Sequence, residues 1–134
     1  MSIDVQNKML KTVLMLDAAT CLAFGLLLCI GNTFLARLLG LPADLLFYAG
    51  MILFPCTVLM FVTGRQACPH SLLVRLIVMG NLGWALASIA VLIVPVGTPT
   101  VIGYGFVIVQ ALAVMGIAAL EYRFAASHSL SAAS

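Results

Sequence analysis

The sequence predicts an all-α polytopic membrane protein, built as an antiparallel bundle of four transmembrane helices. Three observations predict this class. Four long apolar stretches fill most of the 134 residues, and the links between them are short. Hydrophobic residues make up 64% of the chain and charged residues 7%, with a mean hydropathy of +1.24. A helix needs about 20 apolar residues, at about 1.5 Å of rise each, to cross about 30 Å of hydrocarbon.

The four predicted spans cover about residues 12–31, 45–63, 72–94 and 101–122. Together with the N-terminal segment they form a single domain over residues 1–124. Short links force consecutive spans into antiparallel hairpins, and a four-helix bundle follows. The remaining segment, 125–134, is rich in Ser and Ala and is predicted to be a disordered cytoplasmic tail.

The first span carries small or polar residues at every fourth position: Asp17, Cys21, Gly25 and Cys29. This spacing places them on one helix face, where small side chains let neighbouring helices approach closely. Asp17 lies about five residues into the span, roughly 8 Å below the membrane surface. A charged carboxylate costs about 2.5–3.5 kcal/mol at the centre of a span. We therefore expect Asp17 to face the bundle interior or to be protonated.

The second span has Pro55 at its centre, which removes one backbone hydrogen bond. The third span carries Asn81, Trp84 and Ser88, which are three and four residues apart and therefore share a face. Because spans one and three run in the same direction, Asn81 is expected near the depth of Asp17, and a hydrogen bond between them is predicted. The indole N–H of Trp84 needs a partner when it is buried.

The fourth span adds Gln110 near the middle of the bilayer, among small residues. Gly80, Gly83 and Gly116 are expected to pack helices together. Glu121 and Arg123, at the end of this span, are interpreted as charges at the membrane interface. The candidate ligand-binding or proton-binding residues are thus Asp17, Asn81, Trp84, Ser88 and Gln110.

Basic residues near the span ends predict the orientation in the membrane. The N-terminal segment, the central link and the C-terminal end carry Lys8, Lys11, Arg65, Arg75 and Arg123. The first link has only Arg37, offset by Asp44, and the last link (95–100) has no charge. Both termini are therefore expected in the cytoplasm, as a multi-pass protein of a cell inner membrane. No run of Lys or Arg is long enough to predict capture of anionic lipid.

Several kinds of chemistry find no support in the sequence. Cys21, Cys29, Cys56 and Cys68 form no Cys-x-x-Cys pair and are expected to act as small hydrophobic residues. Cys68 and His70 are too few ligands for a metal site. No catalytic triad or phosphate-binding loop appears, so no catalytic residue, metal or cofactor is predicted. The net charge of +2 does not indicate nucleic acid as a partner.

A set of short motifs resembles a group of bacterial four-span integral membrane proteins of uncharacterised activity. The motifs are Leu16-Asp17-Ala18, Leu39-Gly40-Leu41-Pro42, Gly80-Asn81 with Trp84 and Ser88, and Gln110-Ala111. The resemblance covers roughly residues 14–122. It implies a bacterial inner membrane and a role for the polar positions.

Three functions remain open at this point. The first is a non-enzymatic protein that self-associates or docks on a larger membrane complex, as its short loops and small-residue faces favour. The second is a binder or transporter of a small amphipathic or cationic molecule, or of a proton, that uses the carboxylate of Asp17. The third is an enzyme acting on a lipid or quinone, which the absence of a nucleophile–base pair disfavours.

Overall fold

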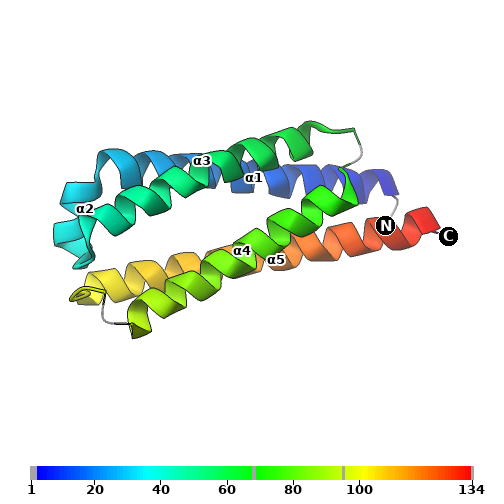
Figure 1. Cartoon of the computed structure of the whole chain (residues 1–134). Coiled ribbons are helices and arrows are strands. Elements are labelled where there is room, and N and C mark those ends of the chain that lie inside the picture. The colour runs from blue at the N-terminus through cyan, green and yellow to red at the C-terminus, as the bar shows by residue number, and fades with distance from the viewer. Residues whose placement is uncertain (1–2, 68, 95, 134) are drawn as a thin grey trace.

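The described part of the chain is helical throughout. The computed structural model describes the backbone of residues 3–67, 69–94 and 96–133, and the side chains of residues 5–67, 69–94 and 96–124. Its elements are α1 (Ile3–Ile30), α2 (Asn32–Leu39), α3 (Ala43–Arg65), α4 (Ser71–Ile93) and α5 (Val101–Ala133) (Figure 1). Cys68 lies outside the described residues.

Four of these helices are long and apolar enough to cross a membrane. The qualifying segments are Val5–Ile30, Ala43–Arg65, Ser71–Ile93 and Val101–Phe124. The predicted all-α four-helix bundle is therefore confirmed, and α3 runs through Pro55 without interruption. Both termini lie at the same end of the bundle (Figure 1).

The helices form two hairpin pairs. Helix α1 packs along α3, α4 packs along α5, and α1 also contacts α5. Helices α3 and α4 touch much less, and α1 and α4 lie diagonally across the bundle without a close backbone approach. A contact between α1 and α4 therefore has to be made by side chains that cross the bundle core.

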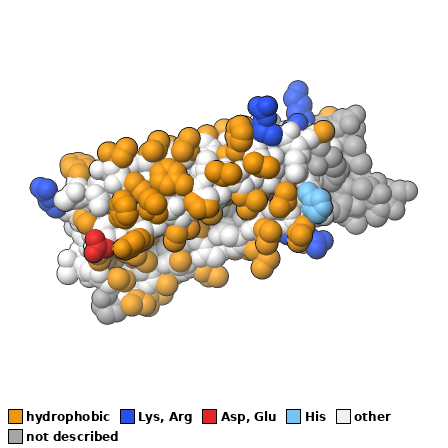
Figure 2. Space-filling view, turned by 45° about the horizontal axis from the view of Figure 1, so that its top comes forward, with side chains coloured by type: hydrophobic (Ala, Val, Ile, Leu, Met, Phe, Trp, Pro, Cys, Tyr) orange, Lys and Arg blue, Asp and Glu red, His pale blue; other side chains and the backbone are white. Residues whose placement is uncertain are grey.

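Apolar side chains cover the outside of the bundle as well as its core. One buried cluster, around Leu10, Leu14 and Val74, lies toward the end that holds the termini. A second, around Leu39, Leu46 and Val107, lies toward α2. Exposed side chains include many large apolar ones, and Figure 2 shows them spread over the helices. An apolar exterior, with the few polar side chains of the spans turned inward, is the arrangement that lipid favours, because lipid offers the exterior no hydrogen bonds.

The short helix α2 was not predicted from the sequence. It follows Gly31 and ends at Gly40, whose φ of 73° is left-handed and suits glycine. Its C-terminal end is joined to the last link by backbone bonds from Thr98 N to Gly40 O (3.1 Å) and from Thr100 N to Leu39 O (3.0 Å). Helix α2 thus ties the first hairpin to the second at the end of the bundle opposite the termini.

The tail differs from its prediction. Residues 125–133 continue the backbone of α5 as helix up to Ala133, where the sequence predicts disorder over 125–134. Alanine has the highest helix propensity of all residues, so an Ala-containing segment that follows a formed helix can extend it. The side chains of this segment lie outside the described residues.

The glycines predicted to pack helices together fall into two groups, one in contact with a neighbouring helix and one facing outward, and the sequence does not distinguish them. A Cβ at Gly25 would meet Gly50 O at 3.3 Å, so the predicted face of α1 does pack closely against α3. Cys29 lies on the same face, and its Sγ is 3.7 Å from Phe47 O. The prediction for Gly80, Gly83 and Gly116 is wrong within this chain, because a Cβ at any of them would meet nothing within 4 Å. These three glycines face outward.

A substitution at Gly50 tests the close contact between α1 and α3. A Cβ there would lie 2.8 Å from Cys29 Sγ and 3.0 Å from Gly25 O, so Gly50→Ala forces the two helices apart. We expect a loss of about 1–3 kcal/mol in the free energy of unfolding, as for other overpacked sites. Unfolding in detergent micelles, followed by circular dichroism, measures it.

Gly80→Ala is the matched control, because it adds the same methyl group where there is open space. Its higher helix propensity should leave stability unchanged or raise it by up to about 1 kcal/mol. Equal losses for the two variants would contradict the tight packing of α1 on α3.

Candidate functional site

Three buried polar side chains meet across the bundle core. Asp17 of α1, Asn81 of α4 and Glu121 of α5 are 2%, 5% and 0% exposed. Asn81 Nδ2 donates to Asp17 Oδ2 at 2.8 Å and to Glu121 Oε2 at 3.2 Å. A side-chain amide has two N–H donors, so a single nitrogen serves both carboxyl groups. This carboxyl pair with its shared amide is the candidate site.

The helices around the pair exclude water from it. Leu14 and Ala18 flank Asp17 on α1, Val78 lies one turn before Asn81, and Ala118 lies one turn before Glu121; all four are buried. Asp17 also has a weak hydrogen-bonding contact within α1: Cys21 Sγ lies 3.7 Å from Asp17 Oδ1. Cys21 Sγ also lies 3.8 Å from Met60 Sδ of α3. All four spans therefore contribute to the walls of the site.

The surroundings of the pair disfavour two negative charges. Asn81 Nδ2 bonds to both carboxyl groups, so the two groups lie on either side of a single nitrogen in a buried site. Neither group forms an ion pair with a described basic side chain. Two carboxylates that share one buried site cannot both stay charged, so we expect the pair to hold at least one proton and at most one negative charge.

One acceptor of the pair is left over. Glu121 Oε1 is buried and has no hydrogen-bond partner among the described residues. Buried carboxyl oxygens are normally satisfied, because an unsatisfied one costs about 1–3 kcal/mol or more. This oxygen is a vacant acceptor position next to the shared proton, and it can receive a proton or a hydrogen-bond donor from a ligand.

A second polar group continues along α4 and α5. Trp84 Nε1 donates to Gln110 Oε1 at 2.9 Å, and Gln110 Nε2 donates to Ser88 Oγ at 2.8 Å. Gln110 Nε2 also donates to Val107 O at 3.0 Å, and Ser88 Oγ donates to Trp84 O at 2.8 Å. Every polar atom in this chain of bonds has a partner of its own. The group therefore holds α4 and α5 together through hydrogen bonds inside the bundle.

The structure brings the five predicted site residues into these two groups. The predicted bond between Asp17 and Asn81 is present. The sequence predicted that the Trp84 indole needs a partner, and the structure shows that this partner is Gln110. Glu121 was missed, because its place near the end of the fourth span was interpreted as interfacial. A signal was available: Glu121 follows Gln110 by 11 residues, which is about three helical turns and returns to the same face.

Metal binding finds no support in the described residues. They contain no group of three or more His, Cys, Asp or Glu side chains that could hold an ion. Cys21, Cys29 and Cys56 are free thiols. Carboxyl groups such as those of the pair can bind a proton or neutralise a positive charge.

Comparison of the chain with models of protein families, with characterised proteins and with solved structures finds no match. The resemblance to short bacterial four-span proteins thus stays a prediction.

Replacing Asn81 should destabilise the bundle, because Asn81→Leu removes the amide that, among the described residues, donates to both carboxyl groups. We expect a loss of about 1–3 kcal/mol in the free energy of unfolding, the usual cost of leaving buried acceptors unsatisfied. Ser88→Ala is the comparison variant. Gln110 keeps its bond to Val107 O there, so the loss should be near the average of about 0.6 kcal/mol for side-chain bonds in membranes. A Ser88→Ala loss as large as that of Asn81→Leu would contradict a special role for the amide.

Proposed function

We propose that the protein is a small transporter or binding protein that couples a proton on the Asp17–Glu121 pair to a cationic or amphipathic molecule. The observation that carries this proposal is the single Asn81 amide bonded to two buried carboxyl groups. Release of the shared proton leaves a second negative charge in a low-dielectric core. A bound cation can compensate that charge, so proton release and cation binding favour each other.

The alternative for the same residues is that they only hold the helices together. The group Trp84, Ser88 and Gln110 fulfils that role with neutral side chains and complete hydrogen bonding. A carboxyl pair is a costly means to the same end, because an ionisable group in a span costs about 2.5–3.5 kcal/mol when charged at its centre. Ionisable residues within spans mark proton and ion pathways more often than packing sites. The vacant Glu121 Oε1 supports the functional interpretation.

We also propose that the end with the termini faces the cytoplasm of a bacterial cell. Lys8, Lys11, Arg65, Arg75 and Arg123 belong to this end, and Figure 2 shows blue side chains gathered there. The α2 end has Arg37 and the acidic Asp44. Basic residues concentrate on the cytoplasmic side of membrane proteins, which supports this orientation.

Infrared spectroscopy tests the shared proton. The chain has only four acidic residues, so its carboxyl bands are few. At neutral pH we expect the wild-type protein to show the carbonyl stretch of a protonated carboxylic acid, and the double variant Asp17→Asn with Glu121→Gln to lack it. Asp44→Asn, at the exposed start of α3, should leave the band unchanged. Absence of the band from the wild-type protein would contradict a shared proton.

A lipophilic cation tests the coupling. Binding of tetraphenylphosphonium to the purified protein should release protons into a weakly buffered solution, read by a pH-indicator dye. Binding should strengthen as pH rises, because loss of the proton supplies the negative charge that attracts the cation. The double variant should bind weakly at every pH. Binding by the wild-type protein with no proton release would contradict the proposal.

Self-association is a second candidate function, supported by the outward-facing glycines. Gly80 and Gly83 of α4 are exposed with open space around them, as small residues are at helix contacts between membrane proteins. We expect chemical crosslinking in native membranes to give a defined oligomer, which Gly83→Ile should weaken through steric bulk. Ala113→Ile, on exposed α5 surface, is the control. A wild-type protein that stays monomeric at all expression levels would exclude this candidate.

A further inference from the structure

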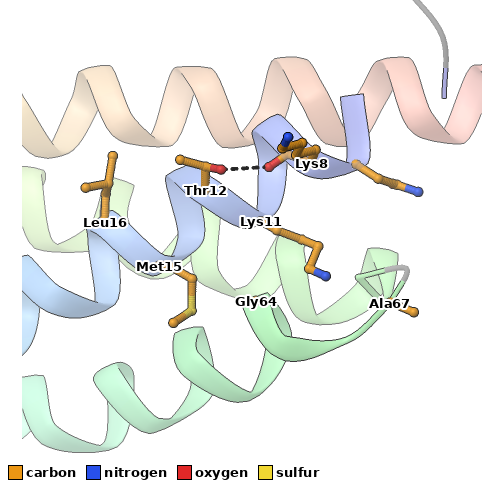
Figure 3. Close-up of a pocket in the computed structure, with 8 residues that line it drawn as sticks. Lys8, Lys11, Thr12, Met15, Leu16, Gly64 and Ala67 are labelled. Atoms are coloured by element: carbon orange, nitrogen blue, oxygen red, sulfur yellow. Dashed lines mark hydrogen bonds between the residues drawn. The ribbon is translucent and has the colours of Figure 1, made fainter. Parts of the chain in front are cut away.

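A groove lies away from the carboxyl pair, at the end of the bundle that holds the termini. It has a volume of about 600 Å³ and lies between α1 and the C-terminal end of α3 (Figure 3). Lys8 and Lys11 line it on the α1 side, and Gly64 and Ala67 line it on the other. We propose that this groove, defined by these four residues with Met15 and Leu16, binds the headgroup of an anionic phospholipid.

The position of the groove matches the headgroup region of a membrane. The apolar segment of α1 is 26 residues long, which at about 1.5 Å per residue gives about 39 Å. The hydrocarbon core is about 30 Å thick, so the helix extends past it by roughly 9 Å, or about six residues. If this extra length lies at the start of the helix, it includes Lys8, and Lys11 follows directly after it. Their ammonium groups therefore lie where lipid phosphates lie.

The groove changes from polar to apolar along α1. Lys8 and Lys11 form its outer part, while Met15 and Leu16 lie one to two turns deeper, with Leu16 61% exposed. A phospholipid has the same order of groups: a phosphate at the surface and an acyl chain below it. A free anion would use only the outer part of such a groove, so the apolar wall favours a lipid over inorganic phosphate.

The lysines are available to an anion. Neither Lys8 nor Lys11 forms an ion pair with a described carboxylate, and Lys11 is half-buried in the groove wall. By contrast, Arg65 is engaged with the ring of Phe61, 5.6 Å from its centroid. A half-buried cation without a counter-ion is costly, and an anionic ligand removes that cost.

Two further features fit a lipid headgroup. Gly64 leaves the groove open, because a Cβ there would meet Met15 Sδ at 3.0 Å and close its floor. Asn7 also lines the groove, and its Oδ1 is buried without a partner in the described structure. An acceptor of this kind next to two cations suits a headgroup that carries both a phosphate and hydroxyl donors. Phosphatidylglycerol has both.

This site was not predicted from the sequence, because the chain contains no long run of basic residues. Folding brings the lysines of α1 against the end of α3, and Arg65, Arg75 and Arg123 add positive charge at the same end of the bundle. The juxtaposition in space replaces the run of basic residues that lipid capture usually requires.

Native mass spectrometry of the full-length protein in a mild detergent tests the proposal. Dioleoyl phosphatidylglycerol and dioleoyl phosphatidylcholine are added in turn, and bound lipid is measured. We expect tighter binding of phosphatidylglycerol to the wild-type protein. A lysine near an anionic surface is worth about fivefold in affinity, so Lys8→Gln with Lys11→Gln should weaken this binding about 30-fold.

The matched control is Arg75→Gln with Arg123→Gln, which removes the same two charges from exposed positions at the same end. The affinity of this variant for phosphatidylglycerol should stay within about fivefold of the wild-type value, which is the effect of one charge at the membrane surface. Ala67→Glu is a second test: this residue is exposed, and its new carboxylate would repel a phosphate from the groove. We expect Ala67→Glu to weaken phosphatidylglycerol binding without affecting phosphatidylcholine.

Three results would overturn the proposal. Equal binding of the two lipids by the wild-type protein would show that the groove does not select anionic lipid. An equal loss of phosphatidylglycerol affinity in the lysine and arginine variants would show that general charge attraction explains the binding. Displacement of the lipid by millimolar inorganic phosphate would show a site for free anions. None of these readouts involves Asp17 or Glu121, so the outcome is independent of the function proposed for the carboxyl pair.

Discussion

The structure depends on the inability of lipid to form hydrogen bonds. Each polar side chain inside a span must find its partner within the protein. The hydroxyls of Thr57 and Thr63 bond to carbonyls of their own helix α3. The amide and carboxyl side chains find their partners across the bundle: Asn81 of α4 meets Asp17 of α1 and Glu121 of α5, and Gln110 of α5 meets Trp84 and Ser88 of α4. These bonds fix which faces of α1, α4 and α5 point inward, because rotation of any of the three helices about its axis would break them.

The two polar groups differ in how completely their hydrogen bonds are satisfied. The group around Gln110 is neutral and complete, and its donors and acceptors satisfy each other. The carboxyl pair is incomplete, since one of its oxygens has no partner among the described residues and two buried carboxyl groups share one amide nitrogen. A complete network resists change, whereas an incomplete one can accept a further proton or donor. This difference is the physical basis for placing the function at Asp17 and Glu121.

Part of this arrangement could be predicted from the sequence. Helical spacing and the parallel directions of spans one and three were enough to pair Asp17 with Asn81. The role of Glu121 could not be inferred from its position near the end of a span, where an interfacial charge is common. Gly25 and Gly83 look alike in sequence, yet one faces α3 and the other faces outward. Which face of a helix is buried depends on its partners in space, and the same holds for the groove at Lys8 and Lys11.

The junction between α2 and the final link has a consequence for how the interior can be reached. Backbone bonds from Thr98 and Thr100 to Gly40 and Leu39 fasten the two hairpins at one end, and the short covalent link between α3 and α4 holds them at the other. A wide V-shaped opening of the bundle would have to break one of these two restraints. A route to the carboxyl pair that leaves both ends joined would therefore require the hairpins to slide or twist against each other, or the surrounding side chains to change rotamer.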